Sequence, residues 1–352
     1  MIMKQSVIMS KCLDKELHCI VECINPDKIF IIVDKTTEKY CLPVIYNIPD
    51  LKNAKIVSID STDNNKNIET VIYVWNELSN NKATRHSLVI NLGGGMVTDL
   101  GGFAASTFKR GIKFINIPTT LLAMVDASVG GKTGVNFNGL KNEIGVFNDA
   151  EAVFINTIFL KTLDAKNICS GYAEMIKHGL INNEQMWSNL ITFDINNPDL
   201  KVLQRNLYES IKVKENIVEA DPHESGIRKA LNLGHTVGHA FESHAMNENR
   251  PILHGYAVAF GLICELYLSC IKLNFPTDKM RQTVNYIKDV YGTYNFNCDD
   301  YSCLYELMKH DKKNNSAKIN FSLLEDIGKV KINQTATKAE IFEAFDFFRE
   351  GL

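Results

Sequence analysis

Two histidines four residues apart are the strongest sign of chemistry in this sequence. They lie in the run Leu231–His239 (LNLGHTVGH), where His235 and His239 each follow a glycine. A spacing of four residues places both imidazoles on one face of a helix. A third histidine, His254, follows 19 residues after His235. Imidazole suits zinc and related divalent metals, so these residues predict a metal site.

An upstream helical run adds a carboxylate and further basic groups. Gly171–His178 (GYAEMIKH) places Glu174, Lys177 and His178 on another helix face. Two histidines, one glutamate and one open position are typical of catalytic zinc, because the open position admits a substrate oxygen. A single histidine is usually an ordinary hydrogen-bonded residue. The prediction therefore depends on several histidines occurring together in motifs that also contain glycine, glutamate and lysine. Spacing does not choose three ligands among five candidates: Glu174, His178, His235, His239 and His254.

A glycine triplet, Gly93–Gly95, directly follows the apolar run Leu88–Leu92 and opens a helical pattern. Backbone N–H groups without a neighbouring Cβ at a helix N-terminus suit a pyrophosphate. The usual dinucleotide fingerprint needs glycine where Thr98 stands, and an acid about 20 residues later. A tight turn is the alternative reading. Gly101–Gly102 then crowds the helix start at about 1 kcal/mol per glycine, which favours close approach by a ligand.

Cationic residues accompany these motifs. A second glycine cluster, Ser128–Gly134 (SVGGKTG), contains Lys132 but fails the P-loop spacing, because Asp126 stands where glycine is needed. Arg228 precedes His235 by seven residues, so we expect it about two helical turns away on a similar face. A single lysine is usually a solvated surface residue. The coincidence of six cations with the motifs predicts a ligand bearing phosphate and carboxylate; they are Lys132, Lys141 (with Asn142 in a loop bounded by glycines), Lys177, Lys214, Arg228 and Lys312.

The elements that must position these groups differ between the two halves of the chain. Short apolar runs alternate with helical patterns in the first half, which indicates βαβ units and a parallel sheet covered on both faces. The strands are expected at Ile29–Val33, Ile56–Ile59, Leu88–Leu92 and Phe114–Ile117, with a helix at Ile68–Leu78. Helical periodicity then dominates Asn167–Tyr291. Two late runs, Lys318–Leu324 and Lys329–Ile332, predict a hairpin before a last helix from about Lys338.

We therefore predict an α/β N-terminal domain over residues 1–156, followed by a mostly α-helical C-terminal domain over 157–352. A ligand is expected in the cleft of such a pair. The chain is 45% hydrophobic and 22% charged, with a net charge of −3, which argues against a basic nucleic-acid-binding face. Nine cysteines without a CxxC pair indicate reduced thiols. We find no signal peptide, and the apolar run Tyr256–Cys264 is too short for a bilayer. The expectation is a soluble, cytoplasmic protein that binds neither membrane nor nucleic acid.

Together the motifs resemble the 3-dehydroquinate synthase family of sugar-phosphate cyclases. The matching stretches run in order over roughly residues 90 to 315. They are Gly93–Gly102, Arg110–Gly111, Pro118–Gly134, Lys141–Asn142, Gly171–Ile181, Glu224–His239, His254–Gly261 and Asp311–Lys313. The resemblance implies a Rossmann-like NAD-binding first domain and a second domain that binds metal and substrate.

The resemblance also implies roles for individual residues. Zn²⁺, with Co²⁺ as an alternative, lies on Glu174, His235 and His254, while His178 has no role. Substrate phosphate is bound by Lys132, Asn142, Asn232, His239 and Lys312 (rather than Lys313), with Arg110 supplied by the second subunit of a homodimer. The substrate carboxylate meets Lys214 and Arg228, and its hydroxyls meet Asp126 and Lys177. NAD⁺ contacts Asp34, Asp63, Lys66, Gly94, Gly95, Met96, Asp99, Thr119, Thr120, Lys141 and the segment from Phe159 to Thr162.

Three departures from the family pattern stand near the cofactor residues. Thr62–Lys66 (TDNNK) replaces the usual Gly-Glu-x-x-Lys, Leu140 replaces a glycine, and Asp149–Ala150 replaces Gln-Pro. None of them removes a chemical group that the reaction needs.

The implied reaction converts 3-deoxy-D-arabino-heptulosonate 7-phosphate to 3-dehydroquinate and phosphate. NAD⁺ takes hydride from the C5 carbinol beside zinc, phosphate leaves by β-elimination, NADH returns the hydride, and the opened ring closes by an aldol step. Two enzyme classes are rivals. A glycerol-dehydrogenase-like oxidoreductase would not need the anion-binding cations, and sister cyclases that form inosose or valiolone skeletons lack a substrate carboxylate. A non-catalytic NAD-binding module is the third alternative.

Overall fold

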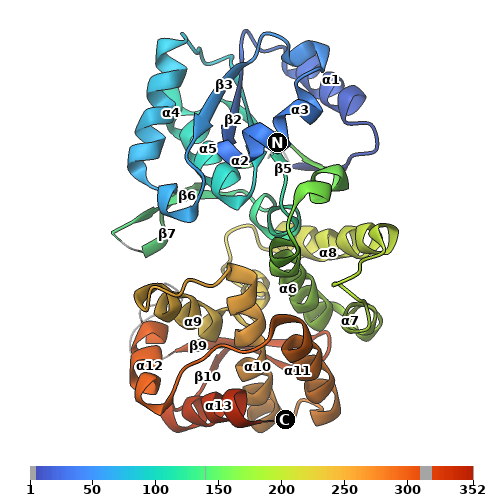
Figure 1. Cartoon of the computed structure of the whole chain (residues 1–352), viewed down its shortest axis with the longest axis vertical. Helices are drawn as coiled ribbons and strands as arrows, with labels where there is room; N and C mark the ends of the chain where they lie inside the picture. The colour runs from blue at the N-terminus through green and yellow to red at the C-terminus, as the bar shows by residue number, and fades with distance from the viewer. Residues whose placement is uncertain (1–4, 139, 310–318, 352) are drawn as a thin grey trace. The chain divides into compact units, whose positions relative to one another are not determined.

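The computed structural model describes residues 5–138, 140–309 and 319–351. The chain forms two compact units, Met1–Asp164 (unit 1) and Ala165–Leu352 (unit 2) (Figure 1). The sequence placed this boundary at 156/157. The extra residues form a short 3-10 helix, Thr157–Thr162, whose Phe159 and Leu160 are buried. Lys312 and Lys313, singled out in the sequence, lie outside the described residues.

Unit 1 contains a parallel sheet of six strands, as the apolar runs predicted. In their order across the sheet the strands are β1 (Ser6–Met9), β8 (Ala152–Ile155), β5 (Lys113–Pro118), β4 (Leu88–Gly93), β2 (Ile29–Asp34) and β3 (Lys55–Ile59). Every residue of β4 is buried, which explains why only Asn91 interrupts its apolar run; its amide donates to Asn116 of β5.

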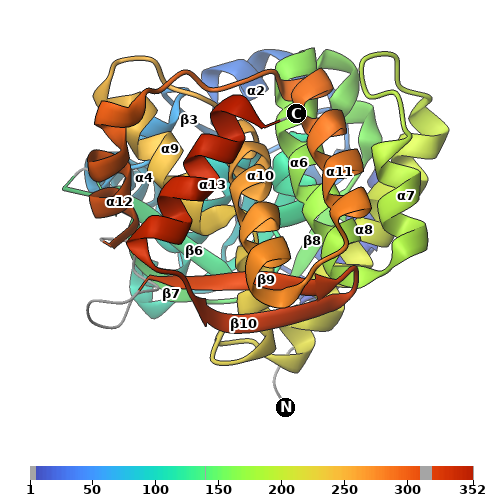
Figure 2. The ribbon, with the colours of Figure 1, turned by 90° about the horizontal axis from the view of Figure 1, so that it is seen from below.

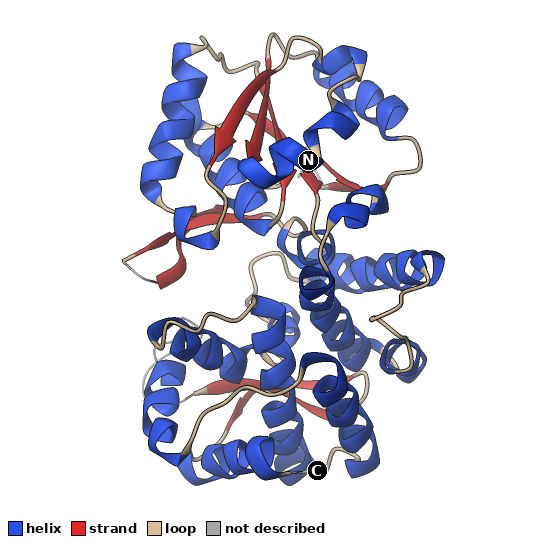
Figure 3. Ribbon diagram, viewed as in Figure 1, coloured by secondary structure: helices blue, strands red, loops and turns tan. Residues whose placement is uncertain are grey.

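Helices and short turns connect these strands (Figure 3). The helices are α1 (Leu13–Ile24), α2 (Lys35–Tyr40), α3 (Leu42–Ile45), α4 (Ile68–Asn80) and α5 (Gly95–Thr107). Shorter 3-10 turns span Pro49–Leu51, Asp63–Asn65 and Phe108–Arg110, and a π-helical turn spans Ala123–Ala127. The chain passes from β2 to β3 on one side and then to β4 on the other side of β2. This reversal puts the ends of β2 and β4 at a topological switch point, where open α/β sheets bind ligands.

A separate hairpin corrects one expectation of the sequence analysis. β6 (Lys132–Phe137) and β7 (Leu140–Phe147) pair antiparallel, so Lys141 and Asn142 lie on a strand and not in a loop. Gly134 pairs with Gly145 in this hairpin, and a Cβ on Gly134 would lie 2.5 Å from the Ile144 carbonyl oxygen. The glycines therefore permit close strand pairing, whereas the sequence reading took them for loop residues.

Unit 2 is mostly helical, as predicted. Its helices are α6 (Ala165–Asn182), α7 (Glu184–Ile191), α8 (Leu200–Ala220), α9 (His235–Asn247), α10 (His254–Leu273), α11 (Thr277–Tyr291), α12 (Tyr301–Lys309) and α13 (Lys338–Glu350), with 3-10 turns η6 (Ile227–Asn232) and η7 (Cys298–Asp300). The late hairpin forms from β9 (Asn320–Asp326) and β10 (Lys329–Thr335), which pair antiparallel.

The helix α10 is the core of unit 2. It contacts α6, α9, α11, α13 and β9, and Figure 2 shows it surrounded by these elements. Among the described residues, α10 is the one helix that is long and apolar enough to cross a membrane, judged by length and composition only. Its mean hydropathy over the apolar window is 1.6. Because 67% of that window is buried inside the unit, α10 has the burial of a core helix.

Candidate active site

Three helices of unit 2 meet through glycine contacts. At the start of α10, a Cβ on Gly255 would lie 1.8 Å from the Ser170 carbonyl oxygen of α6. Gly255 N also donates a hydrogen bond to Ser170 Oγ over 3.1 Å. Further along α10, a Cβ on Gly261 would lie 2.0 Å from the Gly234 carbonyl oxygen. Only glycine permits such close backbones, so α6 and the start of α9 both lie tightly on α10.

This packing brings Glu174, His235 and His254 together. Glu174 lies one turn beyond the α6 contact point, and the two histidines adjoin the contact points of α9 and α10. Glu174 Oε1 is 3.3 Å from His235 Nε2 and 3.5 Å from His254 Nε2. A tetrahedral zinc ion with bonds of about 2.05 Å separates its ligand atoms by about 3.3 Å. The two distances from Glu174 Oε1 therefore fit an ion of this size, and ring nitrogens of His235 and His254 lie within 4.8 Å of each other.

Hydrogen bonds behind the imidazoles set their tautomers. His235 Nδ1 lies 3.1 Å from the Leu233 carbonyl oxygen, and His254 Nδ1 lies 3.3 Å from Glu242 Oε2. Both partners are acceptors, so each Nδ1 carries a proton and, in the neutral ring, each Nε2 turns a lone pair toward Glu174. Three lone-pair-bearing atoms in one place repel one another unless a proton or a cation lies among them. The arrangement suits a metal ion held by oriented imidazoles.

The charges of the cluster are strongly coupled. Burial lowers the pKa of His254, but the negative charge of Glu242 and the bonds to Glu174 and Glu242 outweigh it and raise the pKa to about 10. Burial also opposes the charged form of Glu174 by raising its pKa. The positive charges of Lys177 and His235 outweigh burial and hold that pKa well below its usual range. Glu174 is therefore ionised, and the metal-free cluster keeps a proton that a metal ion would displace.

Three more predicted residues adjoin this cluster. Lys177 is 1% exposed and forms an ion pair with Glu174 Oε2. His239 offers a nitrogen within 4.8 Å of those of His235 and His254, so geometry alone permits it as a ligand too. His178 also approaches Glu174 within 4.8 Å, while its Nδ1 lies 2.7 Å from Ser210 Oγ of α8.

The predicted carboxylate-binding cations are buried, but one expectation about them was wrong. Arg228 was expected on the helix of His235. It lies instead on the separate turn η6, because Gly234 adopts a φ of +79° and breaks the chain direction before α9. Arg228 is 2% exposed and Lys214, on α8, is 5% exposed. Asn232 ends η6 and donates to Glu224 Oε1 over 2.7 Å.

A carboxylate absent from the sequence prediction shapes the segment that bears Arg228. Asp221 accepts hydrogen bonds from the backbone N–H groups of Ser225, Gly226 and Arg228 at 2.7–3.1 Å. Burial opposes its ionisation, but the N–H groups of Gly226, Arg228 and Ser225 outweigh burial and lower the pKa of Asp221 to about 2. Asp221 therefore fixes the backbone on which the Arg228 guanidinium is mounted.

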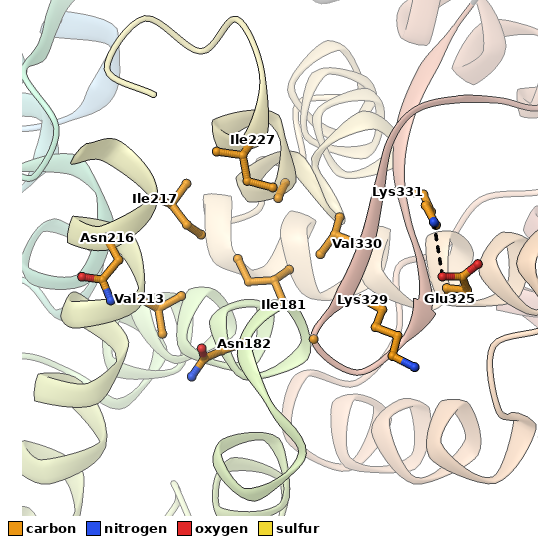
Figure 4. A pocket seen from close by; sticks show the side chains of 12 residues that line it. Ile181, Asn182, Val213, Asn216, Ile217, Ile227, Glu325, Lys329, Val330 and Lys331 are labelled. Atoms are coloured by element: carbon orange, nitrogen blue, oxygen red, sulfur yellow. Dashed lines mark ion pairs between the residues drawn. The ribbon is translucent and has the colours of Figure 1, made fainter. Parts of the chain in front are cut away.

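Unit 2 also contains a cavity of about 430 Å³ that is distinct from the histidine cluster. It lies between α6, α8, η6 and the β9–β10 hairpin, and Ile181, Val213, Ile217 and Val330 turn their apolar side chains toward it (Figure 4). None of its lining residues is a predicted site residue.

In unit 1 the glycine triplet lies at the sheet edge where it was expected. Gly93 ends β4, and Gly94 is the N-cap of α5 with no side-chain cap. Thr119 N donates to the Gly93 carbonyl oxygen over 3.0 Å, and a Cβ on Gly94 would lie 3.1 Å from Thr120 Cγ2. The triplet and the two threonines after β5 are thus neighbours. An uncapped start to a 13-residue helix offers N–H groups to an anion, which fits a cofactor pyrophosphate.

Lys66 joins two other predicted residues in a polar cluster. Its Nζ donates to Asp99 Oδ2 over 2.5 Å and also to Asn142 Oδ1. Lys66 is 5% exposed, and Asn142 N donates to Asn136 Oδ1. The cluster links α5 to the β6–β7 hairpin and places a buried ammonium beside α5.

The remaining candidates of unit 1 are spread along its elements. Asp34 ends β2 and accepts hydrogen bonds from Thr36 N and Thr37 N, so its carboxylate caps α2. Burial raises the pKa of Cys41 to about 11, although Thr119 and Thr162 act to lower it. The others are Asp63 in a 3-10 turn, Met96 on α5, Asp126 in the π-helical turn, exposed Lys132 and Lys141 on the hairpin, buried Phe159, and exposed Arg110.

Sequence reasoning missed the carboxylates that support the cluster. Glu242 follows His235 by seven residues on α9, a spacing of two turns that could have indicated a supporting role. Glu265 is the one acid of α10, and a lone acid in an apolar helix is itself a signal. The sequence offered no comparable signal for Asp221, whose role depends on a local turn.

The fold and site define a class: a protein of two units, one with a parallel sheet whose switch point suits a nucleotide, and one with a histidine–glutamate cluster spaced like a metal site. Residues 56–170 match the family profile described as 3-dehydroquinate synthase N-terminal, and residues 171–314 match 3-dehydroquinate synthase C-terminal. The chain is 52% identical over 348 residues to a 3-dehydroquinate synthase of Parabacteroides distasonis, covering 99% of both chains. It is 37% identical to one of Clostridium tetani, covering 91% of this chain and 85% of the relative. The chain belongs to the 3-dehydroquinate synthase family.

Solved structures share the fold at lower identity. A 2-epi-5-epi-valiolone synthase from Streptomyces hygroscopicus, with NAD⁺ and Zn²⁺ bound, superposes with a TM-score of 0.86 at 22% identity, covering 99% of this chain and 97% of that one. A 2-deoxy-scyllo-inosose synthase complexed with carbaglucose-6-phosphate, NAD⁺ and Co²⁺ gives 0.84 at 21%, covering 98% and 96%. An NADH-dependent butanol dehydrogenase of Thermotoga maritima gives 0.69 at 11%, covering 98% and 96%. Both rival classes therefore share the fold, and fold alone does not choose between them.

Proposed function

We propose that this protein converts 3-deoxy-D-arabino-heptulosonate 7-phosphate to 3-dehydroquinate and phosphate, with NAD⁺ as a catalyst and one divalent metal ion per chain. The 52% identity to a curated 3-dehydroquinate synthase over nearly the whole chain supports this activity over that of the sister cyclases. Within the structure, the convergence of Glu174, His235 and His254 is the observation that carries the proposal.

Glu174, His235 and His254 are our metal ligands. A bound Zn²⁺ or Co²⁺ would supply Lewis-acid stabilisation of a substrate oxyanion. Leu233 and Glu242 orient the two imidazoles, and Lys177 neutralises the second oxygen of Glu174. Since His239 is close enough to be a ligand, the choice of Glu174 needs its own test. We assign His239 to the substrate phosphate. Glu174 Oε1 already lies at tetrahedral spacing from the Nε2 atoms of both other proposed ligands, His235 and His254.

The anionic ends of the substrate need cations in a low-dielectric setting. We assign Lys214 and Arg228 to the carboxylate, since both are buried in unit 2 and Asp221 fixes the backbone of Arg228. Lys132, Asn142, Asn232, His239 and Lys312 are assigned to the phosphate, and Asp126 and Lys177 to the hydroxyls. Buried cations of this kind are rare in helical cores and are expected where an anion binds.

NAD⁺ is assigned to the carboxyl edge of the sheet in unit 1, where it would accept and return hydride. The uncapped start of α5 at Gly94, Gly95 and Met96 would take the pyrophosphate. Lys66 and Asp99 form the buried polar cluster beside it. Asp34, Asp63, Thr119, Thr120, Lys141, Phe159 and Thr162 complete the proposed contacts.

The decisive assay supplies the heptulosonate phosphate in large excess over NAD⁺. We expect continued release of phosphate and 3-dehydroquinate while the concentration of free NADH stays constant, because the hydride returns to the substrate carbon from which it was taken. A dehydrogenase would form one NADH per turnover and stop, and that result would overturn the proposal. The supporting variants are Glu174→Ala, His235→Ala and His254→Ala, each of which should lose metal. His178→Ala and His239→Ala should both retain the metal. If His239→Ala loses its metal, His239 replaces Glu174 as our third ligand.

We further propose a cytoplasmic homodimer in which Arg110 of the partner subunit reaches the phosphate. Arg110 is exposed, and Lys109 and Arg110 both have positive φ angles, 51° and 70°. With Arg85 they line a cationic cavity of about 680 Å³ on unit 1. A cationic turn held in a left-handed conformation suits a group presented to another subunit.

A further inference from the structure

The core helix α10 contains a single carboxylate, and that carboxylate is fully buried. Glu265 is 0% exposed in a helix whose other residues between Ala257 and Leu268 are apolar or glycine apart from Tyr267. A buried carboxylate is costly unless hydrogen bonds compensate for the lost water. Its partners therefore indicate what it is for.

Both oxygens of Glu265 accept hydrogen bonds from the start of α9. Gly234 N donates to Oε2 over 2.7 Å, and Val237 N donates to Oε1 over 3.0 Å. These are the N–H groups of the N-cap and of the third helical residue, which a capping box usually satisfies from within the helix. Gly234 has no side chain to do so. Glu265 thus caps α9 from a neighbouring helix, and its charge complements the helix dipole.

The two capped residues flank His235. The imidazole is attached to the backbone between Gly234 and Val237, and its Nδ1 bonds the carbonyl oxygen just before Gly234. Gly261, one turn before Glu265 on α10, forms the close contact with Gly234. The carboxylate and the glycine contact therefore fix the same few backbone atoms, from which His235 Nε2 reaches the metal position.

We propose that Glu265 is a positioning residue for the metal ligand His235, acting through the N-terminus of α9. The proposal rests on the metal assignment made above. In this role Glu265 is not itself a ligand of the metal. It determines where the ligand nitrogen stands, so its loss should alter metal affinity and geometry more than a general loss of stability would.

Glu265→Gln keeps the shape of the side chain but leaves one oxygen to accept, and it turns an NH₂ group toward the other N–H donor. We expect Co²⁺ affinity to fall about tenfold, as for other residues that orient metal ligands. The visible absorption of bound Co²⁺ should change as well, because the ligand field changes. Amide hydrogens of Gly234 and Val237 should exchange faster in the metal-free variant.

The matched control is Thr283→Val, which removes another buried hydrogen bond of unit 2. Thr283 Oγ1 accepts from Trp187 Nε1 over 2.9 Å and lies on α11. This variant should lose stability but bind Co²⁺ with wild-type affinity and spectrum. If Glu265→Gln also binds Co²⁺ as the wild type does, or if both variants weaken binding equally, the positioning role is overturned. Failure of the wild type itself to bind Co²⁺ would overturn the metal assignment instead.

Discussion

The buried pair Glu174–Lys177 allows the structural and catalytic contributions of one proposed metal ligand to be separated. Glu174 is 0% exposed and Lys177 is 1% exposed, and they form an ion pair three residues apart on α6. Glu174→Ala removes the proposed ligand and also leaves the Lys177 ammonium in a buried site without its carboxylate. Any loss of turnover in this variant therefore has two causes that must be measured separately.

The expected loss of stability follows from burial. Removing one partner of a fully buried ion pair costs about 3–5 kcal/mol, because the remaining charge is left uncompensated. Replacing both partners with apolar residues of similar size is often close to neutral. We therefore expect Glu174→Ala to lower the unfolding free energy of the metal-free protein by about 3–5 kcal/mol. The double variant Glu174→Leu/Lys177→Met should recover most of that loss while remaining unable to bind metal.

The two tryptophans make the measurement specific to unit 2. Trp75 lies on α4 in unit 1 and Trp187 on α7 in unit 2, where it is 4% exposed. In a Trp75→Phe background, urea unfolding followed by fluorescence reports on the unit that contains the pair. A control on α8 has the same spacing: Lys212 and Glu215 are 3.1 Å apart but 50% and 20% exposed. Glu215→Ala should cost less than about 1 kcal/mol.

The unfolding free energy of the double variant Glu174→Leu/Lys177→Met tests whether the unpaired Lys177 ammonium causes the loss of stability. If this variant is as unstable as Glu174→Ala, the stranded ammonium is not the cause, and the reasoning from burial fails. If Glu174→Ala is as stable as the wild type without metal, the site tolerates an uncompensated lysine and the ion pair contributes nothing measurable.

Three further predictions concern Arg228, the carboxylate of Asp221 that fixes the backbone of Arg228, and Arg110. Arg228→Ala should reduce transition-state binding by about 2–4 kcal/mol, since a bidentate carboxylate contact is lost; an unchanged kcat/KM would remove Arg228 from the site. The pKa of Asp221 is about 2 in the folded protein against an ordinary 3.8, so its stabilising effect is present above 3.8 and is lost as pH falls through about 2. Asp221→Asn should flatten that part of the stability–pH curve measured by urea unfolding, and an unaltered curve would contradict the hydrogen-bond assignment. Mixing inactive Arg110→Ala with inactive His235→Ala subunits should restore part of the activity, whereas an active monomer would refute the contribution in trans.

Three interior strands were predictable because burial on both faces selects mostly apolar residues. β2, β4 and β5 were found in this way, and the run Ile56–Ile59 also predicted the edge strand β3. The edge strand β1 and the fully buried interior strand β8, of four residues each, were not predicted. The β6–β7 hairpin was missed because its glycines suggest a loop until a partner strand is known, and the pairing of Gly134 with Gly145 is a tertiary fact.

The candidate site was predictable where chemistry is local to a motif. The spacing of His235 and His239 and the placement of Glu174 beside Lys177 both follow from helix geometry. The orientation of Arg228 did not, because one residue with positive φ, Gly234, redirects the chain after seven residues of apparently continuous pattern. A periodicity argument holds only within a single helix, and a glycine with φ near +79° ends the helix that the argument assumes.

The supporting carboxylates raise a more general point about such a site. Glu242, Glu265 and Asp221 each act on a functional residue through backbone atoms or an outer imidazole nitrogen. None of them has the motif spacing of a ligand, because their role is to hold a position and not to bind a ligand. The types of the proposed ligands can be inferred from sequence, because zinc and related metals prefer imidazole and carboxylate donors. The distances of 3.3 and 3.5 Å between ligand atoms depend instead on how closely α6, α9 and α10 approach, and that approach is set by Gly255 and Gly261 together with the carboxylate of Glu265. The geometry of the proposed metal site is therefore a property of the core of unit 2 as much as of its three proposed ligands.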